Sequence, residues 1–195
     1  TGAYLDKLEI NHKFRNILFQ SDMQHALGVI YKPARGCLQV LDKIYLNEPL
    51  LLPEEQQLFP VLNRGLILNE NTPVPLDIFG PEPDRSWCYH YQSADLARSN
   101  ENWPVVINHW EAANQKGFKA TYGPEYLPFI EAFARLNQWG NAIELTELAN
   151  ATSEKMEPFL CSNWERIADD TSETQEKSIA IETVKNLLKC QSLPE

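Results

Sequence analysis

Two related stretches, Trp103-Pro-Val-Val-Ile-Asn-His-Trp-Glu-Ala-Ala113 and Trp139-Gly-Asn-Ala-Ile-Glu-Leu-Thr-Glu-Leu-Ala149, decide how the second half of this chain folds. Their tryptophans stand 36 residues apart, and in each stretch an isoleucine follows after four residues and an alanine after ten. A similar segment precedes each tryptophan, Ala94–Asn100 in the first case and Ala132–Asn137 in the second. A period of about 34 residues is typical of stacked helical hairpins, so the spacing predicts two copies of such a unit.

Helical periodicity extends from about residue 84 to residue 190. Apolar side chains recur at spacings of three and four residues, as on one face of a helix. Two more such segments follow the second tryptophan stretch. One spans 156–167, and the other begins at a capping-box pattern of Ser172 with Gln175 and has an apolar face from Ala180 to Leu188. The segment 84–190 is therefore predicted to form three stacked tetratricopeptide-like hairpins. The last pair lacks the tryptophan, as expected for a terminal unit with one face to cover.

The N-terminal part, residues 1–80, has a different pattern. Ala26–Tyr31 and Cys37–Leu41 are strand-like runs separated by turn-forming residues, which predicts an antiparallel hairpin. A short helix is expected over Glu54–Leu62, and the four prolines in Asn69–Pro83 indicate a connector between two parts. The predicted fold class is mostly α, α+β overall, with a small α+β part at 1–80 and a helical array at 84–190.

Composition limits the classes of partner. The chain of 195 residues is 43% hydrophobic and has a formal net charge of −10, with no basic run. Nucleic-acid backbones and anionic membrane surfaces are bound by Lys and Arg, so the charge argues against both. No apolar stretch approaches the roughly 18–20 residues needed to span a bilayer. The start at Thr1, without Met or a signal peptide, leads us to expect a processed chain or a domain of something longer.

No catalytic motif is present, and we predict neither catalytic residues nor a cofactor. Cys88, His90 and His109 lack the spacing of a zinc site, which argues against a metal. Two acidic pairs could line a groove, namely Glu125 with Glu131 and Glu144 with Glu147, but a solvated surface is the simpler interpretation. Asp95 and Arg98, three residues apart, are interpreted as a surface ion pair.

The segment Trp87-Cys-Tyr-His-Tyr91 has the most unusual local composition. Some of its rings must lie off the helix face that points to the core. A packing contact with residues 1–80 is the first interpretation. The alternative is a ligand or partner groove lined by Trp87, Tyr89, His90 and Tyr91. Trp103 and Trp139 are assigned structural roles, because large rings fill the gaps between stacked hairpins.

Four cysteines, Cys37, Cys88, Cys161 and Cys190, allow disulfides without requiring them. Buried thiols are the simpler interpretation in a chain of this length. A bridge between Cys37 and Cys88 is the pairing to test if the compartment is oxidising.

Several short segments resemble one known family. The resemblance lies in Gly36–Asp42, Phe79–Pro83, Trp87–Tyr89, Ala94–Arg98, Leu127–Glu131 and Cys161–Glu165. Together they resemble the soluble C-terminal region of bacterial (cyanobacterial-type) multispanning membrane proteins similar to dolichyl-phosphate-mannose-type glycosyltransferases. The catalytic part of such proteins is absent here, so no catalytic residue can be transferred.

The resemblance implies a non-catalytic accessory domain that faces away from the cytoplasm, which would favour the Cys37–Cys88 bridge; a cytoplasmic location is the alternative. The expected partner is a protein or peptide segment, including the membrane part of the same chain, since helical arrays bind extended segments. The alternative function is recognition of a glycan or lipid-linked sugar in the cleft between the two parts. A stand-alone hydrolase is the weakest hypothesis, because no acid pair or Ser/His pair stands out.

Overall fold

The computed structural model describes residues 9–22, 25–31, 36–67, 75–81 and 84–190, which form two compact units. The first unit comprises 1–30, 39–46 and 51–84, and the second comprises 31–38, 47–50 and 85–195. Two short segments from the N-terminal part of the sequence therefore belong to the helical unit.

The described residues of the first unit contain two separate antiparallel sheets of two strands each. β1 (Glu9–Phe14) pairs with β2 (Ile17–Asp22), and β3 (Val29–Ile30) pairs with β4 (Gln39–Val40). The helical elements are all short: η3 (Lys43–Tyr45), α2 (Pro53–Gln56), η4 (Phe59–Val61), η5 (Arg64–Leu66) and α3 (Leu76–Phe79). Its buried apolar side chains are Leu41, Tyr45, Leu51, Phe59 and Val61.

The hairpin expected between Ala26 and Leu41 corresponds to β3 and β4, of which only two residues each are paired. The expected helix at 54–62 is shorter, because α2 ends at Gln56 and a separate 3-10 turn follows.

The β1–β2 hairpin was not predicted. Its turn lacks the glycine that marks tight hairpins, and Arg15 itself adopts the left-handed conformation, at φ 55°.

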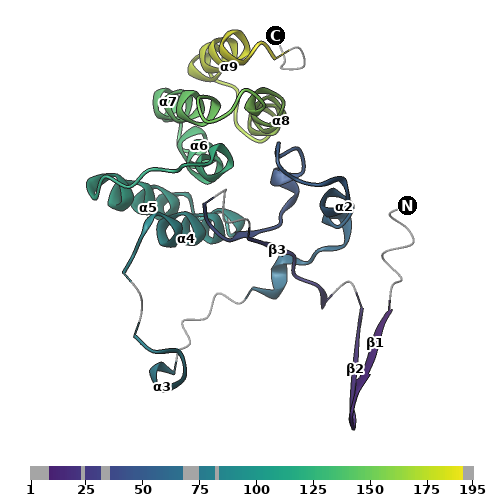
Figure 1. The fold of residues 1–195 in the computed structure, drawn as a ribbon. Coiled ribbons are helices and arrows are strands. Elements are labelled where there is room, and N and C mark those ends of the chain that lie inside the picture. The colour runs from purple at the N-terminus through teal and green to yellow at the C-terminus, as the bar shows by residue number, and fades with distance from the viewer. Residues whose placement is uncertain (1–8, 23–24, 32–35, 68–74, 82–83, 191–195) are drawn as a thin grey trace. The chain divides into compact units, whose positions relative to one another are not determined.

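Six longer helices form most of the described part of the second unit. They are α4 (Trp87–Ser99), α5 (Trp103–Gln115), α6 (Leu127–Arg135), α7 (Trp139–Asn150), α8 (Met156–Asp169) and α9 (Gln175–Leu188), with the 3-10 helix η6 (Gly123–Tyr126) before α6. Consecutive helices pack in pairs, α4 with α5, α6 with α7 and α8 with α9. Figure 1 shows α4 and α5 side by side at one end of this unit and α9 at the other. The protein is thus mostly helical with small sheets, as predicted.

The turns inside the first two pairs have the same geometry. Glu101 and Asn137, 36 residues apart, are both left-handed, at φ 55° and φ 57°. In the first turn the N–H of Asn102 donates to the carbonyl of Ala97 at 2.9 Å. In the second turn the corresponding bond, from the residue before Trp139, measures 2.8 Å. Each bond pairs a carbonyl near the helix end that has no partner within the helix. α4 and α6 therefore end at the same distance before the tryptophan that begins the next helix.

The two landmark tryptophans differ in burial. Trp139 is buried and its ring lies 6.4 Å from that of Trp164 on α8. Trp103 is only half-buried, and the guanidinium of Arg135 lies 5.3 Å from its ring centroid. Both therefore have packing roles, with Trp103 covered by a side chain from the next pair.

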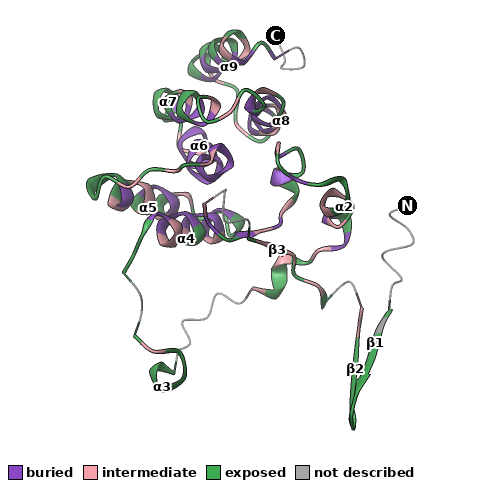
Figure 2. Cartoon of the chain, in the orientation of Figure 1, coloured by how far each residue is buried: buried purple, intermediate pink, exposed green. Residues whose placement is uncertain are grey.

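α6 is the most enclosed helix, since every residue from Leu127 to Ala134 is buried (Figure 2). It contacts helices of all three pairs, namely α4 and α5, α7, and α8. The far end of the unit is closed by a disulfide between Cys161 on α8 and Cys190, just after α9. Within the described part of the chain, no helix has the length and apolarity needed to cross a membrane.

A methyl group at Gly123 would lie 2.7 Å from the carbonyl oxygen of Ala149 and 2.5 Å from the hydroxyl oxygen of Thr152. Backbone cannot yield as a flexible side chain does, so Gly123→Ala is expected to lower the free energy of unfolding by about 1–3 kcal/mol. Urea denaturation followed by circular dichroism measures this change.

Gly140 provides the matched control, because it lies in the first turn of α7 and a methyl group there meets nothing within 4 Å. Gly140→Ala should leave stability unchanged or raise it by up to about 1 kcal/mol, since alanine is the better helix former. Equal stability of the two variants would contradict the close approach of η6 to α7.

Candidate functional site

A short segment of the N-terminal sequence is bound by the helical unit. The segment consists of Gly36, Cys37 and Leu38, and a disulfide joins Cys37 to Cys88 in the first turn of α4. In the chain-entropy description, closing a loop of this separation, 51 residues, stabilises the folded state by about 4 kcal/mol. The covalent bond is accompanied by polar contacts to the main chain.

The carboxylate of Glu125, in η6, accepts two hydrogen bonds. One comes from the backbone N–H of Cys37 at 2.8 Å and the other from the indole N–H of Trp87 at 2.6 Å. Only glycine fits at position 36, next to this carboxylate. Its φ of 102° is unfavourable for other residues, and a methyl group there would lie 2.5 Å from a Glu125 oxygen. The carboxylate therefore fixes both the segment and the start of α4.

Gln92, one turn further along α4, donates its side-chain N–H to the carbonyl of Leu38 at 3.0 Å. Glu125 and Gln92 together bind the N–H and the C=O of adjacent residues. We call these two side chains the main-chain clamp. Such contacts recognise an extended backbone rather than particular side chains.

Packing surrounds the Glu125 side of the clamp, whereas Gln92 is exposed. The Trp87 ring lies within 6.4 Å of the rings of Trp110, Tyr126 and Phe129, which come from α5, η6 and α6. Tyr122, just before η6, donates its hydroxyl proton to buried Glu48, whose segment also belongs to this unit. The segment at 47–50 is thus a second point at which N-terminal sequence meets the helices.

The aromatic residues singled out from the sequence do not form one exposed surface. Trp87, His90 and Tyr91 are buried, and Tyr89 is half-buried with the guanidinium of Arg85 4.7 Å from its ring centroid. Cys88, between them, is in the disulfide with Cys37. The segment 87–91 therefore packs inside the helical unit at most of its positions.

His90 and His109 meet at 3.5 Å between their Nδ1 atoms. Burial is the main cause that lowers the pKa of each ring below 6.5, helped by Lys116 and Arg85 at His90 and by His90 and Arg85 at His109. Among the described residues, no group of three His, Cys, Asp or Glu side chains is arranged to hold a metal.

A second polar cluster joins the first helices of the three pairs. The Glu131 cluster consists of Asp95 and Arg98 on α4, Glu131 and Arg135 on α6, and Arg166 and Asp170 at α8. Its three acids and three bases balance in charge. Asp95 and Glu131 are 36 residues apart, so they occupy equivalent positions of consecutive pairs.

Glu131, which is only 2% exposed, lies at the centre of this cluster. Arg166 binds it through both guanidinium nitrogens, at 2.6 and 2.9 Å, and Arg135 lies 3.5 Å away. Asp95 and Arg98 are also buried, at 3.0 Å from one another. The expectation of a surface ion pair at these two residues was wrong, because α6 packs against α4 and brings Glu131 within 3.9 Å of Arg98.

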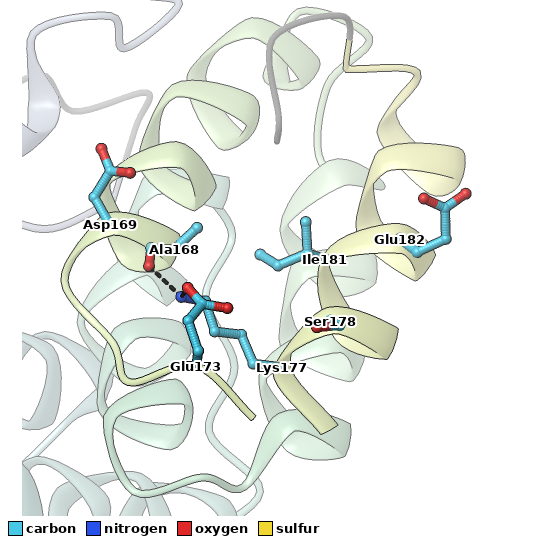
Figure 3. Close-up of a pocket in the computed structure, with 7 residues that line it drawn as sticks. All are labelled: Ala168, Asp169, Glu173, Lys177, Ser178, Ile181 and Glu182. Atoms are coloured by element: carbon cyan, nitrogen blue, oxygen red, sulfur yellow. Dashed lines mark hydrogen bonds and ion pairs between the residues drawn. The ribbon is translucent and has the colours of Figure 1, made fainter. Parts of the chain in front are cut away.

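A pocket of about 430 Å³ lies between α8 and α9, lined by Ala168, Asp169, Glu173, Lys177, Ser178, Ile181 and Glu182 (Figure 3). The ammonium of Lys177 is already engaged, donating to the carbonyls of Ala168 and Thr171 and pairing with Glu173 at 2.5 Å. The carbonyl of Ala168 belongs to the last turn of α8 and that of Thr171 lies just beyond the helix, where a cation is favourable. Lys177 therefore stabilises a helix end, and the pocket gains no free cation from it.

No protein-family model, curated protein or solved structure matches this chain. The site must therefore be interpreted from its own geometry.

Sequence reasoning identified Cys37, Cys88 and the candidate acids Glu125 and Glu131, which the structure places in two different sites. Glu144 and Glu147 are exposed on α7. Gln92 and Arg166 were not singled out. The 36-residue shift that relates Asp95 to Glu131 was a usable signal, whereas a lone glutamine on a helix gives none.

The carboxylate at Glu131 compensates buried arginine charge. Glu131→Ala should therefore lower the free energy of unfolding by about 3–5 kcal/mol, the range for removing one member of a buried ion pair. Glu147→Ala, at an exposed position of α7, should change it by less than about 0.5 kcal/mol. Denaturant unfolding of both variants measures the difference. Similar values for the two would show that the cluster does not stabilise the fold.

Burial raises the pKa of Glu125 to about 6, from a usual value of 4.5; the bonds from Cys37 and Trp87 oppose this, and Glu48 adds to it. The folded state then holds the proton more tightly than the unfolded chain, so stability falls as pH rises between these values. The expected loss is about 2 kcal/mol.

Glu125→Gln should lack this fall. Urea denaturation between about pH 4 and pH 7 measures the difference in stability between wild type and variant. As pH rises over this range, wild type should lose about 2 kcal/mol relative to the variant. Any constant offset from the lost acceptor leaves the slope unaffected. Glu111→Gln, at an exposed position of α5, is the control. A difference that is independent of pH would contradict the raised pKa.

Proposed function

We propose that the helical unit is a non-catalytic interaction module that binds an extended protein or peptide segment. The observation that carries this proposal is the main-chain clamp, in which Glu125 and Gln92 bind the backbone of Cys37 and Leu38. The residues of 36–38 act as a ligand supplied by the chain itself. The pairing of α4 with η6 and α6 provides the rigid surface on which an extended segment can be bound.

The chemistry of the clamp suits a polypeptide. An acceptor and a donor are set at the separation of the N–H and C=O groups of neighbouring residues, a pattern that recurs wherever an extended chain is recognised through its main chain. The requirement for Gly36 adds a side-chain preference, since Glu125 leaves no room for a Cβ at that position. A partner segment would carry a glycine before its bound residue.

The sequence resemblance suggests the kind of protein to which this module belongs. We propose that it belongs to a membrane glycosyltransferase-like protein, with the membrane part of the same chain as one source of the bound segment. We further propose an extracytoplasmic location. Two disulfides support this location, because such bonds persist in oxidising compartments.

Sugar recognition remains the alternative proposal, and no contact favours it over peptide binding. Stacking on a sugar needs an accessible ring face, and Trp87, His90 and Tyr91 are buried. Tyr89 is half-buried beneath Arg85.

The test supplies the segment as a separate peptide. In the full chain, Cys37→Ser, Cys88→Ser and Gly36→Val together should release the internal segment, because valine cannot fit against Glu125 at φ 102°. A fluorescent peptide with the sequence of residues 31–41, in which serine replaces the cysteine, should then bind, as measured by anisotropy. Wild type should not bind it, because its own segment occupies the clamp at a high effective concentration.

Adding Gln92→Ala or Glu125→Ala to the triple variant should weaken peptide binding by roughly five- to tenfold each, the effect of one lost hydrogen bond. Gln115→Ala, exposed at the end of α5, is the matched control and should have no effect. The helical circular dichroism of each variant verifies its folding. A folded triple variant that fails to bind at about 1 mM peptide would overturn the proposal.

A further inference from the structure

The β1–β2 hairpin exposes an apolar tip. Phe14 is 62% exposed, Ile17 70%, Leu18 57% and Phe19 55%. All four belong to the three cross-strand pairs next to the turn, whereas two of the three pairs at the base, Asn11 with Gln20 and Glu9 with Asp22, are polar. Exposed apolar clusters of this kind mark interaction sites.

The apolar side chains surround the tip. Cross-strand partners share a face of a hairpin, so Phe14, Ile17 and Phe19 lie on one face and Leu18 lies on the other. A protein surface would cover one face and leave the other in water. A medium that surrounds the tip buries both faces, and the lipid–water interface is such a medium.

The charge of the tip differs from that of the whole chain. Lys13 and Arg15 flank Phe14, and there is no acidic residue from position 10 to position 21, although the chain as a whole has a net charge of −10. The guanidinium of Arg15 lies 5.4 Å from the Phe14 ring centroid. Cations beside exposed aromatic and aliphatic side chains are the combination that binds anionic lipid headgroups.

We propose that the tip of the β1–β2 hairpin inserts into the interface of a bilayer that contains anionic phospholipids. Three residue pairs at about 3.4 Å per residue give a depth of roughly 7–10 Å, which matches the headgroup–acyl boundary reached by interfacial segments. Lys13 and Arg15 extend their charged ends to the phosphates while their stems lie along the apolar layer. The base of the hairpin, with Glu9, Asn11, Gln20 and Asp22, remains in water. This proposal is independent of peptide binding by the helical unit.

The test is co-sedimentation of the full chain with phosphatidylcholine vesicles, with and without phosphatidylglycerol. Wild type should bind the anionic vesicles. Ile17→Ser combined with Phe19→Ser should weaken this binding at least tenfold, because most of the buried apolar surface is lost.

Lys13→Gln with Arg15→Asn keeps the apolar residues, and asparagine tolerates the left-handed turn position. This pair should weaken anionic-vesicle binding by roughly fivefold for each charge at low salt.

The matched control is α3, whose Ile78 and Phe79 are 72% and 71% exposed. These two residues follow the acidic Asp77 and have no basic residue next to them in the sequence. Ile78→Ser with Phe79→Ser should leave vesicle binding unchanged. The proposal is overturned if wild type does not sediment with anionic vesicles, or if the α3 and hairpin variants behave alike. It is also overturned if the protein is a dimer in solution that Ile17→Ser with Phe19→Ser dissociates, since a second copy would then cover the tip.

Discussion

The buried carboxylate of Glu131 constrains how the helical unit can be assembled. It lies on α6, the helix that is enclosed on all sides, and arginines from α4, α6 and α8 surround it. A charge in such a place is tolerated only when its partners are in position. The three helix pairs must therefore pack in one register relative to each other, because a shift of one helix would leave guanidinium groups buried without an acid.

This rigidity bears on the proposed binding of a peptide segment. The clamp depends on the separation between Gln92 on α4 and Glu125 before α6, which is fixed by the packing of the first two pairs. A clamp made from one helix could not hold both the N–H and the C=O of neighbouring residues at these positions. The charged cluster and the aromatic packing around Trp87 act on the same helices, so the binding geometry is a property of the array rather than of a loop.

Much of the helical part could be predicted from the sequence because its signals are local. The tryptophan spacing, the apolar periodicity and the turns before Trp103 and Trp139 all depend on residues close together in the chain. Contacts between distant segments carry no such signal. The bond between Gln92 and Leu38 joins residues 54 positions apart, and burial of Asp95 and Arg98 depends on helices that follow them. The β1–β2 hairpin was missed for a local reason, since Arg15 occupies a turn position where glycine would have been diagnostic.

The disulfide between Cys37 and Cys88 has a consequence for proteolysis. It connects the two ends of a loop that includes the proline-rich stretch at residues 69–83. A protease that cuts anywhere inside this loop would produce two fragments that remain covalently joined. The N-terminal segment would thus stay attached to the helical unit until a reductant opened the bridge. Only cleavage between Asp22 and Cys37 would release the β1–β2 hairpin.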